Sequence, residues 1–489
     1  YKRQLLGNAA IKEQSFNGTN VDVSEWPKSK LLISPRLGFN WDIKGDRSIV
    51  LTGGTGLFTG LLPFVWFTNQ PTNAGQMQNM VEFETSELPA NFAFNPNYKE
   101  TLTQNPDMFP STPGNEVPGA IAYVDPNFKM PQVWRSNVNA EFQLPYGFML
   151  SVGAMYTRDI YNVVQKNMNE KAPSGTYNEQ PGRVYWTKNN YYDNPKTKTV
   201  IQLTNGDEKG YQYSFNAVLT KKFDFGFTGS FGYTYTMAKD MTANPGSSAA
   251  SVWQNNVAVN SLNDPGVSYS LFSTPHRLIA NASYEVAYAN MKTTVSLFYT
   301  GYQQGRFSYT YSNDMNGDGN YSDLMYVPAS KEEMTFVDIK DKQNNVTYSA
   351  VDQQEDFWNY VNNDSYLNDH KGQYVERASS LEPWIHRFDM KIAQDFYAKI
   401  GSRKYGIQVS LDMLNIGNLL NSKWGAYRSC GLQSYDNVRL LKTASKVGEP
   451  LTYQMNASSR EVFQKNSKWD YTASTGSAWQ MQLGVKFTF

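Results

Sequence analysis

The segment WQMQLGVKFTF, residues 479–489, decides the fold. Its odd positions are all apolar or aromatic, whereas its even positions read Gln, Gln, Gly, Lys and Thr. A period of two places every apolar side chain on one side of a β-strand. A tilted strand that crosses a bilayer needs about 9–11 residues. The segment therefore predicts a membrane-spanning strand with one lipid face and one wet face.

The same alternation recurs along the whole chain. Strands are expected at 33–42, 47–58, 132–144, 148–158, 211–222, 225–237, 276–287, 291–303, 384–397, 405–415 and 479–489. Short links alternate with long connections at roughly 59–131, 159–210, 238–274, 304–383 and 416–477. Short turns at one end and long loops at the other are typical of bacterial outer-membrane barrels, whose long loops face outside. The sequence thus predicts an all-β protein, an antiparallel transmembrane β-barrel with long extracellular loops in the outer membrane.

The strand count suggests that more strands complete the wall. About eleven strands are expected, whereas a bacterial single-chain barrel normally has an even number. An open sheet would leave unpaired backbone groups in lipid, each at a cost of several kcal/mol. We therefore expect residues 1–489 to be the C-terminal part of a barrel of about 22 strands, with the plug and N-terminal domains outside this sequence.

Composition excludes several other classes. No run of about 18 apolar residues is present, which excludes a transmembrane helix. The formal net charge is zero, so no nucleic-acid partner is expected. The single cysteine, Cys430, excludes an internal disulfide framework. A soluble β-sandwich would have a core of Val, Ile and Leu, but the apolar faces here are strongly aromatic. No GxSxG, HExxH or phosphate-binding motif is present, so nothing predicts an enzyme.

Several stretches carry a family resemblance, and they spread over nearly the whole chain. They are SPRLGFNWDIKGDRSIVLTGGTGLFTGLLPFVWFTNQ (34–70), WRSNVNAEFQLPYGF (134–148), NDMNGDGNYSDLMYVP (313–328), RFDMKIAQDF (387–396), LDMLNIGNLLNSKWG (411–425) and GVKFTF (484–489). In these stretches the chain resembles the TonB-dependent receptors of Bacteroidetes-type bacteria, particularly the Oar-like group and the related SusC-type transporters. The resemblance implies a 22-stranded barrel around a plug, energised by a TonB-type inner-membrane complex, with a surface lipoprotein as a partner in the SusC-type group.

The resemblance implies active import of a nutrient ligand such as an oligosaccharide or a peptide. The chain departs from the family because it shows no TonB box, plug or regulatory-like domain, so the energy-coupling chemistry cannot be read from it. Two alternatives stay open. One is a passive porin, and the other is a surface or secretion-associated barrel that acts as a binding platform. The residues that contact the substrate are not predicted by the sequence.

One loop is a candidate metal site. Oxygen-bearing side chains at alternating positions, followed by a glycine that permits a sharp turn, are the pattern of a calcium loop. The candidate ligands are Asp314, Asn316, Asp318, Asn320 and Asp323. The usual glutamate at position 12 is replaced by Met325, and Asp323 could substitute for it from position 10. A structural calcium ion is one interpretation, and an Asx-rich turn without any ion is the other.

Two further sets of residues have expected roles. The resemblance implies that the terminal aromatics form a barrel-assembly signal, while the same residues would also anchor in lipid; they are Trp479, Phe487 and Phe489. Charged residues on the wet faces would line the lumen, where they would bind a plug by charge-assisted hydrogen bonds or tune an open channel. They are Arg36, Arg135, Glu141, Arg277, Glu285, Arg387, Asp389 and Lys391.

Overall fold

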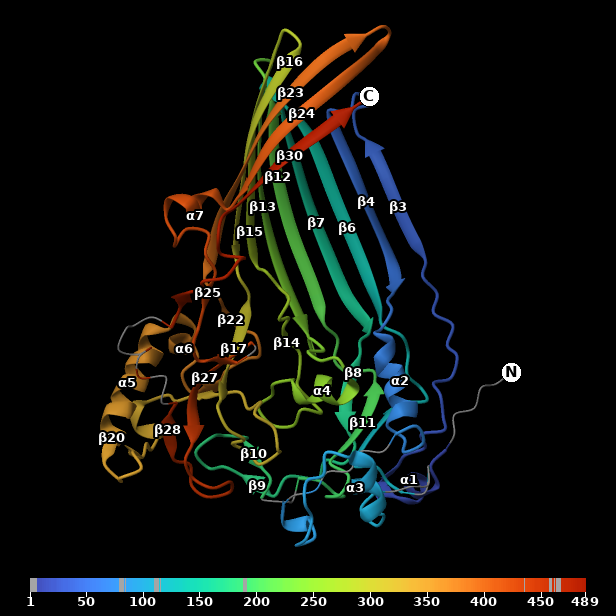
Figure 1. Ribbon diagram of the computed structural model, residues 1–489, viewed down its shortest axis with the longest axis vertical. Coiled ribbons are helices and arrows are strands. Elements are labelled where there is room, and N and C mark those ends of the chain that lie inside the picture. Colours follow the sequence, from blue (N-terminus) through green and yellow to red (C-terminus); the bar gives the residue numbers. More distant parts are fainter. Residues whose placement is uncertain are drawn as a thin grey trace.

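The computed structural model describes residues 7–78, 83, 85–109, 114, 116–187, 191–434, 436–456, 460, 462 and 468–489. Long strands form one curved antiparallel sheet, and the segments between them form a folded layer at one end of it (Figure 1). We call the first part the barrel sheet and the second the loop layer. The predicted all-β antiparallel fold is confirmed.

The barrel sheet follows the order of the sequence. Along its path lie β3 (Arg36–Asp42), β4 (Ile49–Thr59), β6 (Gln132–Leu144), β7 (Phe148–Tyr161), β12 (Tyr211–Lys222), β13 (Phe227–Asp240), β15 (His276–Tyr288), β16 (Met291–Gln303), β23 (Trp384–Ile400), β24 (Arg403–Leu414) and β30 (Gln480–Thr488). A short strand, β14 (Ser268–Tyr269), pairs with the end of β13. Every strand that the alternation predicts is present, and the boundaries differ by a few residues.

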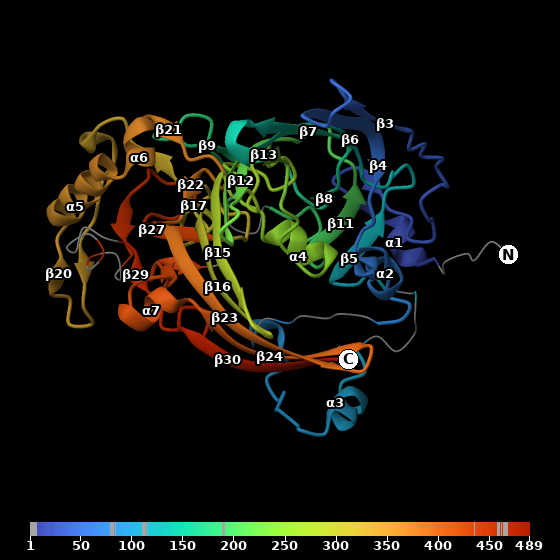
Figure 2. The ribbon, with the colours of Figure 1, turned by 90° about the horizontal axis from the view of Figure 1, so that it is seen from above.

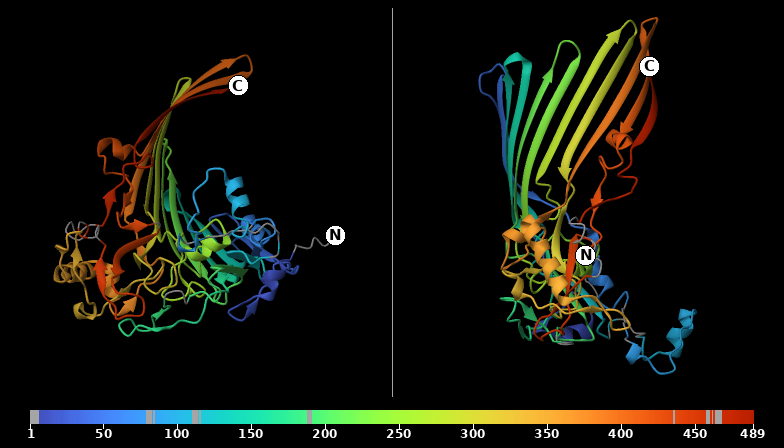
Figure 3. Two further views of the ribbon diagram at one scale, coloured as in Figure 1. Left: turned by 60° about the horizontal axis from the view of Figure 1, so that its bottom comes forward. Right: turned by 90° about the vertical axis from the view of Figure 1, so that its left-hand side faces the viewer.

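The boundary differences have local causes. Strand β3 begins at Arg36 rather than at residue 33, because Pro35 has no N–H to donate to a ladder. Strand β23 runs on to Ile400, so that only Gly401 and Ser402 connect it to β24. Gly401 has a φ of 62°, a conformation that glycine adopts at little cost. The short turns all lie at the end away from the loop layer (Figure 3).

Register divides the barrel sheet into two faces. Residues that pair across neighbouring strands point to the same face, so Arg36, its partner Gly56 and the next partner Arg135 lie on one face. Following the paired residues from β6 to β15 places Arg277 on that face as well. The same face carries all the charged residues expected in the lumen: Arg36, Arg135, Glu141, Arg277, Glu285, Arg387, Asp389 and Lys391. The opposite face carries the aromatic series. This separation matches a wall with lipid on one side, while contact of the charged face with a plug stays a prediction.

The sheet is open between its first and last strands. Among the described residues, β3 pairs only with β4, and β30 pairs only with β24. Viewed from above, the strands follow an arc from β3 to β30 (Figure 2). Closure of this arc into a barrel of about 22 strands by an upstream part of the protein stays a prediction.

The loop layer contains its own small sheets. One holds β5 (Ala120–Val124), β11 (Thr199–Thr204) and β8 (Val164–Asn167), and another holds β22 (Ser380–Leu381), β17 (Arg306–Tyr311), β27 (Asn437–Thr443), β26 (Gln433–Ser434) and β28 (Tyr453–Met455). Two-stranded pairs are β1 (Ser15–Phe16) with β2 (Thr19–Asn20), β9 (Gly175–Thr176) with β10 (Val184–Tyr185), β18 (Tyr326–Val327) with β21 (Gln373–Tyr374), β19 (Ile339–Lys340) with β20 (Val346–Tyr348), and β25 (Arg428–Ser429) with β29 (Asp470–Tyr471). The pairs β5–β11 and β17–β27 are parallel and join distant parts of the chain.

Short helices complete the layer. They are α1 (Ala9–Glu13), α2 (Phe64–Thr72), α3 (Tyr98–Gln104), α4 (Ala249–Gln254), α5 (Ala350–Asn363), α6 (Ser365–Asp369) and α7 (Ile416–Leu420), with 3₁₀ turns at Thr85–Glu87 and Lys331–Glu333. Another 3₁₀ turn, Pro145–Gly147, connects β6 to β7 at the opposite end of the barrel sheet. None of the helices in the described part of the chain is long and apolar enough to span a membrane. The largest described core packs Phe307, Tyr309 and Tyr311 of β17 against Val438 of β27 and Phe357 of α5. The long connections are thus packed structure, which the sequence did not predict.

Candidate functional site

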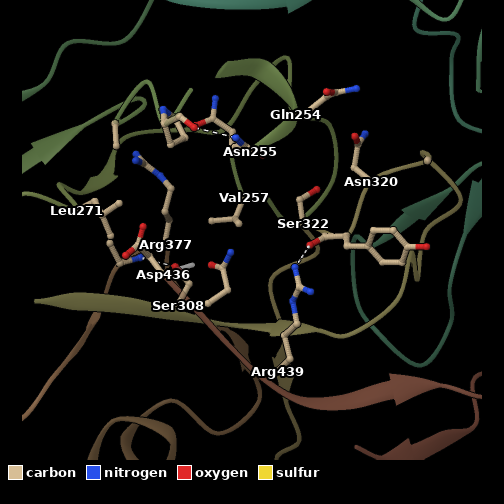
Figure 4. A pocket seen from close by; sticks show the side chains of 17 residues that line it. Gln254, Asn255, Val257, Leu271, Ser308, Asn320, Ser322, Arg377, Asp436 and Arg439 are labelled. Atoms are coloured by element: carbon tan, nitrogen blue, oxygen red, sulfur yellow. Dashed lines mark hydrogen bonds between the residues drawn. The ribbon is translucent and has the colours of Figure 1, made fainter. Parts of the chain in front are cut away.

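A cavity of about 430 Å³ lies inside the loop layer. Figure 4 shows side chains that surround it, with Arg377 and Arg439 on different sides. Three of the long connections contribute to its wall: Ala243, Pro245, Gln254, Asn255, Asn256, Val257 and Leu271 from the first, Ser308, Gly319, Asn320, Tyr321, Ser322, Arg377 and Ala378 from the second, and Asp436, Asn437 and Arg439 from the third. A cavity of this size suits a small ligand or one unit of a larger ligand.

Arg377 is a buried cation in the wall of this cavity, with 5% of its surface exposed. Its Nη1 donates to Asp240 Oδ1 at 2.9 Å, and its Nη2 donates to the carbonyl oxygen of Asp240 at the end of β13. Its Nε is buried and has no hydrogen-bond partner. An unsatisfied buried donor costs about 1–3 kcal/mol, so a ligand that accepts a hydrogen bond here would be stabilised.

Arg439 lies on β27 and is the second arginine of the wall. Its Nη2 donates to the carbonyl oxygen of Tyr321 at 3.3 Å, and its Nε is also buried without a partner. Burial lowers the pKa of Arg439 from its usual value, although the group stays protonated at neutral pH. Among the described residues no carboxylate forms an ion pair with Arg439.

The remaining polar groups suit a ligand rich in hydroxyl, carbonyl or amide groups. Four asparagines, one glutamine and two serines line the cavity together with Val257 and Leu271. Asp436 adds a carboxylate, and the shielding of its carboxyl group from water raises its pKa. Amide and hydroxyl groups can both donate and accept hydrogen bonds, and each arginine has a buried Nε–H group without a partner. The cavity can therefore bind a neutral polar ligand or one that carries an acidic group.

The acidic loop, residues 314–323, forms part of the same wall. Asp314 begins it and accepts three backbone N–H groups: Oδ1 accepts from Gly317 at 2.7 Å and from Asp318 at 3.1 Å, and Oδ2 accepts from Gly319 at 2.9 Å. Gly317 and Gly319 have φ angles of 82° and 83°, which allow the sharp turn. Asp323 closes the loop, where its Oδ2 accepts from the backbone N–H of Met315 at 3.0 Å.

The acidic loop buries negative charge. Asp318 is 1% exposed, and its Oδ2 has no hydrogen-bond partner. Burial raises the pKa of Asp318 well above its usual value, and repulsion from Asp323 and Asp314 adds to the effect. Burial also raises the pKa of Asp323 to about 7, although Arg183 opposes this shift. Across the described residues no three His, Cys, Asp or Glu side chains converge as a group that could hold a metal ion, so calcium would also need amide, carbonyl or water oxygens.

Arg183 contacts the end of the acidic loop through its ion pair with Asp323. The side chain is fully buried, and its Nη1 lies 3.3 Å from Asp323 Oδ1. Its Nη1 also donates to the carbonyl oxygen of Val259, its Nη2 donates to that of Leu324, and its Nε donates to Gln180 Oε1 at 3.2 Å. These bonds connect three long connections, so Arg183 ties the acidic loop to the rest of the layer.

The other predicted site residues lie on the barrel sheet. On the aromatic face at the C-terminal strand, Trp479, Phe487 and Phe489 are 41%, 57% and 86% exposed, which fits lipid contact. Their role as an assembly signal stays a prediction. On the charged face, Lys391 forms an ion pair with Asp412 at 2.8 Å, and Asp389 accepts the backbone N–H of Asn415 at 2.7 Å.

Sequence reasoning identified the acidic loop but missed Arg183 and Arg377, which are buried, and Arg439, which is half-buried. Arg439 interrupts an apolar run in NVRLLKT, residues 437–443, and a charge in an apolar run is a signal of a buried functional group. Arg183 and Arg377 have no comparable signal, because their partners Asp323 and Asp240 lie 140 and 137 residues away in the chain.

A comparison with known protein families agrees with this architecture. Residues 7–424 match the family model described as outer membrane beta barrel domain. A search among curated proteins gives no match. Among solved structures, the chain is similar to the outer membrane transporter YddB from Escherichia coli, with a TM-score of 0.41 and 11% identity over 94% of this chain and 41% of that one. It is also similar to the siderophore receptor PirA from Acinetobacter baumannii, with a TM-score of 0.35 and 11% identity over 79% of this chain and 37% of that one.

The chain therefore spans less than half the length of either of these two structures. The family match covers most of the chain, and the two-faced barrel sheet is the structure that such a match requires. The protein is a resident of the outer membrane and belongs to the outer membrane β-barrel domain family.

Proposed function

We propose that the protein imports a nutrient ligand, such as an oligosaccharide or a peptide, across the outer membrane by TonB-dependent transport. The observation that carries this proposal is the polar cavity at the loop end of the barrel sheet, where Arg377 and Arg439 each keep one buried N–H group free. A packed loop layer with a cavity supports capture of a ligand before passage. A surface lipoprotein that delivers the ligand is part of the proposal.

The charged face of the barrel sheet supports a plugged lumen. Lys292 of β16 lies 3.0 Å from Glu285 and 4.0 Å from Asp395, and Gln408 of β24 donates to Asp395 at 2.9 Å. Such groups can exchange partners with a plug at modest cost, since paired charges on a wet face are only weakly held. In this proposal a TonB-type complex would act on such a plug.

Removal of the TonB-type complex is expected to abolish uptake through this protein. Uptake of fluorescent oligosaccharides and of fluorescent short peptides would be measured in cells with and without that complex. Active import predicts that at least one of these probes enters only when both the protein and the complex are present. Uptake that persists without the complex would instead support the passive porin. Uptake that is unchanged when the protein itself is deleted would support the binding platform.

Arg439→Ala is expected to weaken binding of the transported probe by about 10–100-fold, because a hydrogen bond to a charged group contributes about 1.5–3 kcal/mol. Binding to the purified protein would be measured by fluorescence anisotropy. Arg47→Ala is the matched control, since Arg47 is exposed in a short turn at the opposite end of the sheet and has a φ of 59°. Equal affinities of the two variants would contradict the role of this cavity.

A further inference from the structure

The acidic loop contains more carboxylates than the nearby cations can neutralise. Asp318 and Asp323 are each 1% exposed, and Asp314 lies in the same loop. Among the described residues, Arg183 is the only cation within ion-pair distance of these three carboxylates. Uncompensated buried charge is strongly destabilising. The arrangement therefore lacks positive charge.

A second, independent observation indicates where that charge belongs. Asp318 Oδ2 is buried and accepts no hydrogen bond, although Asp318 Oδ1 accepts from the backbone N–H of Asn320 at 2.7 Å. The side chain of Asn316 is fully buried, and its Oδ1 accepts from the backbone N–H of Asp318 at 3.0 Å. Native proteins leave few buried acceptor atoms unsatisfied, and a bound cation is one group that would satisfy the Asp318 carboxylate. Oxygen-rich loops with a glycine turn are suited to Ca²⁺, which accepts carboxylate, amide, carbonyl and water oxygens.

We propose that the acidic loop, residues 314–323, binds one calcium ion through side-chain oxygens of Asp314, Asn316 and Asp318, with backbone carbonyl and water oxygens completing the shell. Asp323 stays paired with Arg183 and is not a ligand of the ion. Only two of the proposed ligands are carboxylates. The proposal therefore does not need three His, Cys, Asp or Glu side chains around one ion, a group that the described residues do not contain. Gly319, Asn320 and Ser322 line the cavity, so the ion would hold one wall of it.

The unmodified protein provides the first test. Protein purified in detergent, stripped with a chelator and then titrated with Tb³⁺ should show sensitised luminescence, because Trp186 donates its backbone N–H to the carbonyl oxygen of Asn316 at 2.7 Å and therefore lies beside the site. Added Ca²⁺ should displace Tb³⁺, equal Mg²⁺ should do so much less, and metal analysis should give one calcium per chain. Absence of bound calcium, or of any calcium-dependent rise in Tm, would overturn the proposal.

Asp318→Asn provides the second test. The sign of its effect on stability, measured with and without calcium, distinguishes a calcium site from a turn without any ion. With the chelator present, the variant should be at least as stable as the unmodified protein, since a buried repulsive charge is gone. With calcium present, it should be less stable and should bind calcium at least tenfold more weakly. A turn without any ion predicts the same stabilisation in both conditions, and that outcome would refute the site. Asp341→Asn is the control, because Asp341 forms an exposed turn with Gln343 and Asn345 and should leave calcium binding unchanged.

Discussion

Arg183→Met is expected to destabilise the loop layer by about 3–5 kcal/mol, the range found when one partner of a buried ion pair is removed. The substitution leaves the Asp323 carboxylate, 1% exposed, without its cation, and it removes the donors to the carbonyl oxygens of Val259 and Leu324. The thioether of methionine can fill the space but cannot donate a hydrogen bond. Guanidinium unfolding of the purified protein, followed by intrinsic fluorescence with a chelator present, would measure the loss.

Two further variants test whether the loss of stability comes from the buried ion pair. Lys166→Met breaks an exposed ion pair with Asp207, whose atoms are 3.7 Å apart, and should cost no more than about 1 kcal/mol. Adding Asp323→Asn to Arg183→Met should recover part of the stability, because a neutral amide oxygen can still accept from Met315. If Arg183→Met costs as little as Lys166→Met, the buried pair does not hold the layer together.

Leu483→Arg should destabilise the folded barrel by about 2–4 kcal/mol, the cost of a cation on the lipid face near the middle of the bilayer. Leu483 lies near the centre of β30 on the aromatic face and is 72% exposed. Its partner across the ladder, Leu411 of β24, gives the arginine no counter-charge. The measurement is the unfolding free energy of the protein in phospholipid vesicles.

The neighbouring position offers a control on the other face. Gln482 pairs with Asp412 of β24, so Gln482→Arg places a cation opposite a carboxylate and should change stability by less than about 1 kcal/mol. Equal costs at positions 482 and 483 would show that the aromatic face does not contact lipid. A larger cost at 482 would reverse the assignment of the two faces.

The barrel strands could be predicted from the sequence because the residues of each strand alternate according to the lipid and water on its two faces. A strand between lipid and water alternates at every second residue, as the segment 479–489 does, and this period is visible without any partner strand. The turns are equally local, since residues such as Gly147 and Gly401 permit the positive φ that a tight turn needs. Only the exact ends of the strands, at Arg36 and Ile400 for example, were not predicted by the alternation.

The loop layer could not be predicted in the same way. Its sheets join segments far apart in the chain, as when β17 pairs in parallel with β27. Strand β17 carries no periodic signal, because all of its residues are buried. The cavity was equally hidden, since Arg377 and Arg439 reach it from different connections and neither belongs to a motif. The acidic loop was visible because its spacing is a property of ten consecutive residues.

The sequence by itself thus determined the two-faced strands, their order, the positions of the short turns and the oxygen-rich loop at 314–323, since all of these depend on residues close together in the chain. Only the tertiary structure decided that the long connections pack into a layer, that Arg183 meets Asp323, and that three connections enclose a polar cavity. The physical reason is that burial and charge pairing between distant segments depend on the whole arrangement, which no local pattern records.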